Sequence, residues 1–95
     1  MPKPIAILGS TGSVGTQALD VIAAHPEHFS AAVLAAHGND GLLEEQIERF
    51  KPEIAVLADV RSAERLRSRY RGRTQILAGE EGLLEAAVYP DRKST

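Results

Sequence analysis

The fold is decided by the segment Gly9-Ser10-Thr11-Gly12-Ser13-Val14-Gly15 near the start of the chain. It directly follows Pro4–Leu8, a short apolar run that is typical of a strand buried on both faces. From Val14 onward, apolar residues recur with the period of an amphipathic helix. A glycine-rich turn between a buried strand and a helix predicts the first unit of an α/β fold.

Outward from this turn, strand-like and helix-like segments alternate along the chain. Apolar runs predict the strands Pro4–Leu8, Ala31–Ala36, Glu53–Leu57 and Thr74–Leu77. Three helices are predicted from inner stripes formed by Val14, Ala18, Val21 and Ile22, by Leu43, Ile47 and Phe50, and by Val60, Ala63, Leu66 and Tyr70. A last short helix is predicted over Glu80–Ala87. Since short connections between such units require right-handed crossovers, we predict a Rossmann-like α/β parallel sheet of about four strands with flanking helices.

The composition is that of an ordinary globular chain. It has 95 residues, a net charge of −2 and no cysteine, which excludes a disulfide framework and any thiolate metal site. No apolar run approaches the roughly 18 to 20 residues that would cross a bilayer. An arginine cluster is interpreted as a solvated helix face, because its spacing scatters the guanidinium groups: Arg61, Arg65, Arg67, Arg69, Arg71 and Arg73. We therefore expect a cytoplasmic domain with no nucleic-acid or membrane partner.

The glycine-rich turn predicts a dinucleotide site. Gly9 supplies the tight turn, Gly12 leaves the backbone bare where a pyrophosphate must approach, and Gly15 lets the helix pack closely on the sheet. Free N–H groups at the start of the helix attract the phosphates. The candidate cofactor-binding residues here are Gly9, Ser10, Thr11, Gly12, Ser13, Val14 and Gly15. The spacing is G-x-x-G-x-x-G rather than G-x-G-x-x-G, and a turn that only tightens strand–helix packing is the alternative interpretation.

The end of the second predicted strand bears on which dinucleotide is bound. An NAD site usually carries an acid there to hold the ribose 2′-hydroxyl, whereas this chain continues with His37, Gly38 and Asn39. The missing carboxylate removes the main repulsion against a 2′-phosphate and favours NADP. His37 is a candidate to stack on adenine or to donate to the phosphate, and a solvent-exposed loop side chain is the alternative. Asn39 or Asp40 is the expected N-cap of the following helix.

The segment from Ile7 to Ile22 closely resembles the opening of the 1-deoxy-D-xylulose 5-phosphate reductoisomerase family. Further segments are similar to later landmarks of that family and occur in the same order: His25–Phe29, Leu34–Ala36, Glu45-Gln46, Phe50–Pro52 and Leu77–Leu83. The resemblance extends from about Pro4 to Ala87.

The resemblance implies an NADPH-dependent oxidoreductase of non-mevalonate isoprenoid biosynthesis. Members of the family convert 1-deoxy-D-xylulose 5-phosphate to 2-C-methyl-D-erythritol 4-phosphate and use a divalent metal, Mg, Mn or Co. It also implies that Thr11, Gly12, Ser13 and Val14 contact the NADPH phosphates, and that His37-Gly38-Asn39 faces the adenosine 2′-phosphate. The family loop usually reads Ala-Gly-basic-Asn, and the basic residue is displaced or replaced in Ala36-His37-Gly38-Asn39.

The resemblance places the metal carboxylates, the catalytic lid and the substrate-phosphate residues of the family beyond residue 95. No catalytic or metal-binding residue is therefore assigned, and we expect residues 1–88 to be an incomplete NADPH-binding domain, inactive alone, followed by a divergent tail at 89–95. A first strand without its second neighbour would expose Ile5–Leu8 as an apolar edge, so self-association is expected. The alternative functions are a non-catalytic nucleotide-binding or assembly module and a different reductase that shares this half-fold.

Overall fold

The structure is a computed structural model that describes residues 2–94, with side chains described for residues 2–89. Strands and helices alternate along the chain: β1 (Lys3–Leu8), α1 (Ser13–Ala24), β2 (Phe29–Ala36), α2 (Asp40–Phe50), β3 (Ile54–Leu57), α3 (Val60–Arg69), β4 (Gln75–Ala78) and α4 (Gly79–Ser94). Neighbouring strands all pair in parallel, in the order β1-β2-β3-β4. The predicted α/β fold with a parallel sheet is confirmed.

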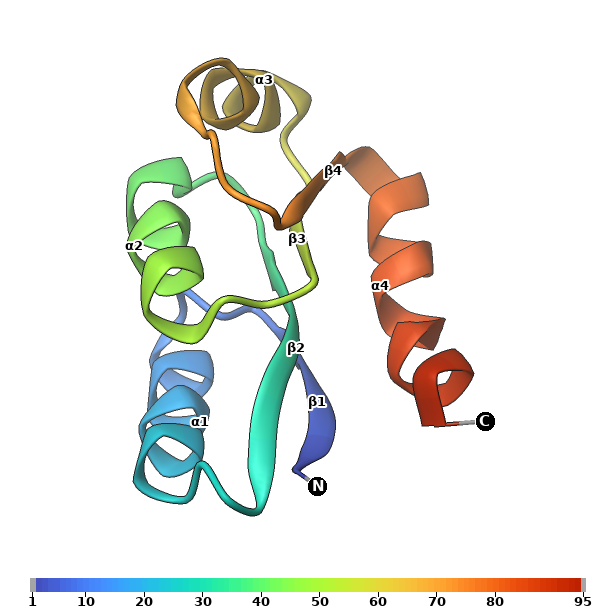
Figure 1. Cartoon of the computed structure of the whole chain (residues 1–95). Helices are drawn as coiled ribbons and strands as arrows, with labels where there is room; N and C mark the ends of the chain where they lie inside the picture. The colour runs from blue at the N-terminus through green and yellow to red at the C-terminus, as the bar shows by residue number, and fades with distance from the viewer. Residues whose placement is uncertain (1, 95) are drawn as a thin grey trace.

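The sheet is the middle layer of three. Figure 1 shows α1 and α2 on one side of the sheet and α4 on the other, with α3 beyond α2. The strand β2 separates two cores: Leu34 and Ala36 pack with residues of α1, α2 and α3, whereas Val33 and Ala35 pack with residues of α4. Burial of both faces explains why the strands read as continuous apolar runs.

The predicted inner stripe of α1 was only partly right, since Ile22 is buried and Ala18 packs against the core. Val14 and Val21 were expected to face the sheet, but their side chains are 78% and 54% exposed. The buried residues are Gly15, Leu19 and Ile22. A Cβ atom on Gly15 would overlap the carbonyl oxygen of Gly9, so this glycine must face the turn and thereby sets the rotation of the helix.

The beginning of α2 decides between the two predicted caps. The side-chain oxygen of Asn39 accepts a hydrogen bond from the Leu42 N–H at 3.2 Å, so Asn39 is the N-cap. Asp40 is the first residue of the helix, and its carboxylate pairs with Arg69 at 2.8 Å and with Arg65 at 3.4 Å. Its charge is therefore balanced mainly by the arginines of α3.

The start of α3 differs from its predicted stripe in the same way. Val60 is 50% exposed, and Ser62 is buried beside Ala63 and Leu66. The reason is the cap: Asp59 accepts hydrogen bonds from the Ser62 hydroxyl at 2.6 Å and from the Ser62 N–H at 3.3 Å. These bonds hold a polar side chain on the inner side of the first turn.

The last helix is longer than the prediction of Glu80–Ala87, because it runs from Gly79 to Ser94. Ala86 is fully buried against the sheet. One turn later, the Tyr89 hydroxyl donates to a carboxylate oxygen of Glu53 at 2.8 Å. These contacts continue past the predicted end and anchor α4 across the sheet face.

Strand β1 lies at an edge of the sheet, as expected for a first strand without a second neighbour. The N–H groups of Lys3 and Gly9 donate toward β2, to His28 and Ala35 at 2.8 and 2.7 Å. Since alternate residues of a strand point in opposite directions, the intervening Pro4, Ala6 and Leu8 direct their backbone groups away from β2. Proline is tolerated at such an edge because it lacks the N–H.

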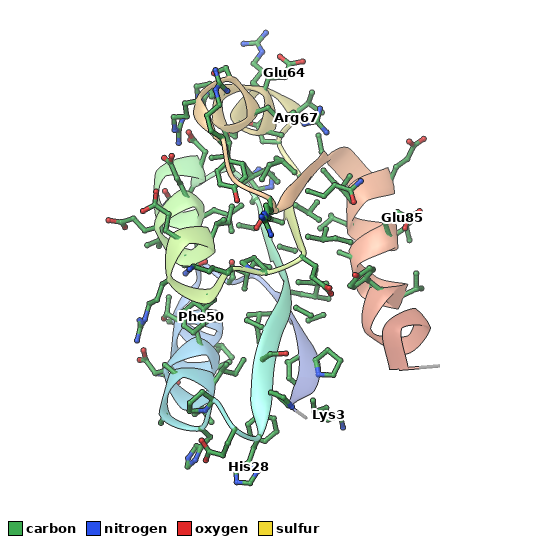
Figure 2. The ribbon with its side chains drawn as sticks, in the orientation of Figure 1. Lys3, His28, Phe50, Glu64, Arg67 and Glu85 are labelled. Atoms are coloured by element: carbon green, nitrogen blue, oxygen red, sulfur yellow. The ribbon has the colours of Figure 1, made fainter. Side chains whose placement is uncertain are left out.

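The opposite edge, at β4, is covered by a side chain of α3. The guanidinium of Arg67 donates to the Ile76 carbonyl from Nε at 3.0 Å and from Nη2 at 2.7 Å (Figure 2). Figure 2 also shows Glu64 on the outer side of α3 and Glu85 on the outer side of α4. The interpretation of the arginine cluster as a solvated face was therefore too simple, since Arg67 and Arg69 have structural partners.

Candidate functional site

The glycine-rich turn is a closed loop at the carboxyl end of β1. Gly9 has a φ of 78°, a left-handed conformation that favours glycine. The N–H groups of Gly9 and Ser10 both donate to the Ala35 carbonyl, at 2.7 and 2.9 Å. The Gly12 N–H donates back to the Gly9 carbonyl at 3.0 Å. These bonds tie the turn to the end of β2, and they also occupy the N–H of Gly12.

The first turn of α1 follows directly and is open to an anion. Gly12 is the N-cap and provides no side-chain cap, and the first turn contains no acidic residue. The N–H groups of Ser13, Val14 and Gly15 therefore have no intrahelical acceptor and lie at the positive end of the helix dipole. A Cβ atom on Gly12 would contact only the Gly9 oxygen, at 3.4 Å. The space above Gly12 is open, which is the arrangement that phosphate groups require.

The side chains of the turn point in different directions. Ser13 is exposed and Thr11 is half-buried, so both hydroxyls lie near the surface. Ser10 is fully buried, and its carbonyl accepts a hydrogen bond from Nε2 of Gln46 at 2.8 Å. Among the residues whose side chains are described, neither the Ser10 hydroxyl nor Oε1 of Gln46 has a hydrogen-bond partner. Ser10 therefore belongs to the support of the turn, although the sequence placed it with the ligand-facing residues.

Gln46 is the residue of this region that sequence reasoning did not assign to the site. A signal was available: Gln46 follows Leu43 by three positions and so falls on the inner stripe of α2. A polar residue on an apolar stripe indicates a specific hydrogen bond in the interior. Here that bond links α2 to the backbone of the turn.

The second predicted segment, His37-Gly38-Asn39, connects β2 to α2. His37 is exposed, and its carbonyl accepts a hydrogen bond from the Asp59 N–H at 2.8 Å. A Cβ atom on Gly38 would lie 3.5 Å from the hydroxyl oxygen of Ser62. The loop is therefore held from one side by the Asn39 cap of α2 and from the other by the start of α3.

A hollow of about 370 Å³ brings the two predicted segments together. It is lined by Leu8, Gly9, Ala35, Ala36, His37, Ala58 and Leu83. The hollow lies at the carboxyl ends of the strands, where open α/β sheets bind their ligands. Its lining is apolar apart from His37, and ligand pockets of this kind occupy about 300–1,000 Å³. The arrangement can hold a flat, largely apolar group beside the anion-binding turn.

A larger hollow, of about 770 Å³, lies at the carboxyl-terminal ends of α2 and α3. Its lining mixes acids with bases, among them Glu44, Glu48, Arg71 and Arg73. It lies near Thr74, at the amino end of β4, and is therefore remote from the glycine-rich turn. Because ligands of open α/β sheets bind at the other end, the smaller hollow is the better candidate site.

Two carboxylates flank the loop at residues 37–39. The hydrogen bond from Arg69 lowers the pKa of Asp40 below its ordinary value of 3.8. The hydrogen bond from the Ser62 hydroxyl likewise lowers the pKa of Asp59. Both groups are therefore ionised at neutral pH, and Asp40 is neutralised by arginines of α3.

In the described part of the chain, no group of three or more histidine, aspartate or glutamate side chains is arranged to hold a metal ion. No helix there has both the length and the hydropathy that crossing a bilayer demands.

The chain is similar to known proteins over nearly all of its length. The family model described as 1-deoxy-D-xylulose 5-phosphate reductoisomerase matches residues 5–95. The 1-deoxy-D-xylulose 5-phosphate reductoisomerase 1 of Bacillus cereus is 50% identical over 91 residues, which cover 96% of this chain and 24% of that protein. The chloroplastic 1-deoxy-D-xylulose 5-phosphate reductoisomerase of Mentha piperita is 41% identical and matches over 95% of this chain and 20% of its own length.

The chain is also similar to solved structures of reductoisomerases. The 1-deoxy-D-xylulose 5-phosphate reductoisomerase of Zymomonas mobilis, in complex with NADPH, aligns with a TM-score of 0.86 at 30% identity, over 93% of this chain and 24% of its own. A reductoisomerase structure in complex with magnesium aligns with a TM-score of 0.78 at 28% identity, over 92% of this chain and 22% of its own. The chain thus spans about a quarter of the length of the curated relatives it matches.

Proposed function

The chain belongs to the 1-deoxy-D-xylulose 5-phosphate reductoisomerase family, and from this premise we propose that it binds NADPH for the reductoisomerase reaction. That reaction converts 1-deoxy-D-xylulose 5-phosphate to 2-C-methyl-D-erythritol 4-phosphate in non-mevalonate isoprenoid synthesis. When bound, NADPH supplies the hydride. The residues of this chain bind and orient the cofactor, since positioning is what the protein contributes to such chemistry.

The observation that carries the proposal is the open backbone at Gly12 beside the uncapped start of α1. A pyrophosphate there would accept hydrogen bonds from the N–H groups of Ser13 and Val14, and from the hydroxyls of Thr11 and Ser13. Gly9 and Gly15 shape the turn without contacting the phosphates through side chains. The NADPH complex of the similar Zymomonas mobilis protein supports the choice of ligand.

The apolar hollow beside the turn is the proposed seat of the adenosine. His37 lines it together with Ala35 and Ala36, and we propose that its ring stacks on the adenine. The loop His37-Gly38-Asn39 would then face the 2′-phosphate. The absence of an acid at the end of β2 supports NADP over NAD, since a carboxylate there would repel that phosphate.

The family's divalent metal is assigned to no residue of this chain. Relatives have been solved with magnesium, but the described residues contain no cluster of three donors that fits an ion. The metal and the sugar phosphate substrate are therefore proposed to bind only in the full-length proteins of the family. We place the NADPH-binding portion in residues 1–88, and α4 carries the chain on to Ser94. A cytoplasmic location fits a chain without cysteine.

We also propose that the isolated 95-residue chain self-associates through the free edge of β1. The edge presents outward-directed backbone groups at Ala6 and Leu8, and the Leu8 side chain is 60% exposed. Unpaired apolar edges of this kind pair readily with another strand. Calorimetric titration with NADPH tests the cofactor proposal, and sedimentation tests the association.

A further inference from the structure

We propose that Arg65, on α3, supplies the positive charge that recognises the 2′-phosphate of the cofactor. This inference rests on the proposed binding of NADPH. NADP sites of this fold place an arginine near the 2′-phosphate. The loop that would face the phosphate, His37-Gly38-Asn39, contains no lysine or arginine. The charge can instead come from an element packed against the loop.

That element is α3. Position 38 lies against its first turn, because a Cβ atom on Gly38 would be 3.5 Å from the Ser62 hydroxyl oxygen. The same hydroxyl accepts a hydrogen bond from Nη2 of Arg65 at 2.9 Å. Nη2 also lies 3.4 Å from Oδ1 of Asp40. The guanidinium of Arg65 is thus anchored beside both ends of the segment 38–40.

Arg65 is an available cation, whereas Arg67 and Arg69 are already committed to other partners. Arg69 lies 2.8 Å from a carboxylate oxygen of Asp40 and 2.8 Å from one of Glu44. Arg67 covers the edge of β4. Arg65 has one long ion pair, and its side chain is 57% exposed. Its guanidinium has five donors in a planar fork, so it can keep Ser62 and still donate to a phosphate.

Asp40 is the group that competes for Arg65. If Arg65 turns toward a phosphate, Asp40 keeps its shorter bond to Arg69 and is not left unpaired. The rearrangement therefore leaves no buried charge without a partner. Removal of the Asp40 carboxylate should free Arg65 and also remove a negative charge near the phosphate, so it should strengthen NADPH binding.

The test compares NADPH and NADH by calorimetry on the 95-residue chain and its variants. Arg65→Met should weaken NADPH binding by about tenfold or more, the loss expected for a hydrogen-bonded charge, and leave NADH binding unchanged. Arg61→Met removes an exposed arginine of the same helix and should behave as wild type. Arg65→Lys should retain part of the preference. Asp40→Asn should increase the preference for NADPH. If Arg65→Met does not fold, Arg65→Gln at this exposed position is measured in the same way and decides the matter.

The results separate this inference from the function it rests on. If Arg65→Met keeps the wild-type ratio of NADPH to NADH affinity, or the wild-type chain binds both equally, the role of Arg65 is overturned and cofactor binding stands. If the folded wild-type chain binds neither dinucleotide, the proposed function and the role of Arg65 are both overturned.

Discussion

The side-chain amide of Gln46 donates a hydrogen bond to the main-chain carbonyl of Ser10 at 2.8 Å, and both residues are buried. The bond joins the middle of α2 to the glycine-rich turn, which are 36 positions apart in the chain. The turn is therefore fixed from two directions: by the end of β2 through Ala35 and by α2 through Gln46. An anion site made of backbone groups depends on such fixation, because it has no side chains that can adjust to the ligand.

Replacing Gln46 should therefore loosen the turn. Gln46→Met keeps the length and volume of the side chain but leaves the Ser10 carbonyl buried without a donor, which should cost about 1–3 kcal/mol of unfolding free energy. Urea denaturation, followed by circular dichroism, measures this change in the free energy of unfolding. Gln17→Met on the exposed side of α1 is the matched control and should change little. Equal stability of the two variants would show that the bond contributes nothing.

The contact between Gly15 and Gly9 should be intolerant of a single methyl group. Gly15→Ala places a Cβ atom on the Gly9 carbonyl oxygen, so backbone must move, at a cost of about 1–3 kcal/mol. Gly41→Ala is the control, since a Cβ atom there meets nothing within 4 Å and alanine favours the helix by up to about 1 kcal/mol. Opposite shifts in Tm are expected for the two variants. A Gly15→Ala protein as stable as wild type would refute this account of the turn.

The order and type of the elements could be predicted because strands and helices differ in their apolar period and are separated by glycine, proline and polar caps. The facing of α2 could also be predicted, because Leu43, Ile47 and Phe50 all pack in the core, but the facing of α1 could not. Val14 and Val21 fit a helical stripe as well as Gly15, Leu19 and Ile22 do, and only the contact of Gly15 with Gly9 chooses between them. A search for apolar side chains gives glycine no weight, although Gly15 determines how α1 packs against the turn.

The candidate site could likewise be predicted only in part. The sequence placed the glycine-rich turn and the loop at residues 37–39, because parallel strands bring their carboxyl ends to one edge. It could not show that Ser10 faces inward, that Gln46 supports it, or that α3 packs on Gly38. These are tertiary contacts between residues far apart in the chain. The period of α2 can mark Gln46 as an inward-facing polar residue, but it does not identify the partner.

The pairing of Asp40 with Arg69 should appear in the pH dependence of stability. The pKa of Asp40 is lowered by this hydrogen bond, so its stabilising contribution is present above about pH 3.8 and is lost as the pH falls through the lowered value. Asp40→Asn should therefore reduce the Tm at pH 7, and the difference from wild type should shrink below pH 4. Thermal melts from pH 2 to pH 7 measure this difference in Tm between the variant and wild type. A constant difference across that range would mean that the charge of Asp40 is unimportant.

Self-association through β1 should be blocked by a charge on its free edge. Leu8→Lys should shift the chain toward monomer, because lysine on an edge strand opposes pairing. Leu84→Lys removes a comparably exposed leucine from α4, 70% exposed against 60% for Leu8, and should leave association unchanged. Sedimentation velocity at several concentrations distinguishes them. A wild-type chain that stays monomeric at high concentration, or equal effects of the two lysines, would contradict the edge mechanism.

The most direct test of the account is NADPH titration of the wild-type chain and of Gly12→Val by calorimetry. The Cβ atom of a valine at position 12 meets only the Gly9 oxygen, at 3.4 Å, and the φ of −83° suits any L residue, so the variant should still melt cooperatively. Its side chain would fill the space over the N–H groups of α1. We expect binding by wild type and by the distant Gly41→Ala variant, and a loss of affinity of more than about tenfold in Gly12→Val. Undiminished NADPH binding by a folded Gly12→Val chain would contradict the claim that bare backbone at this turn holds the pyrophosphate.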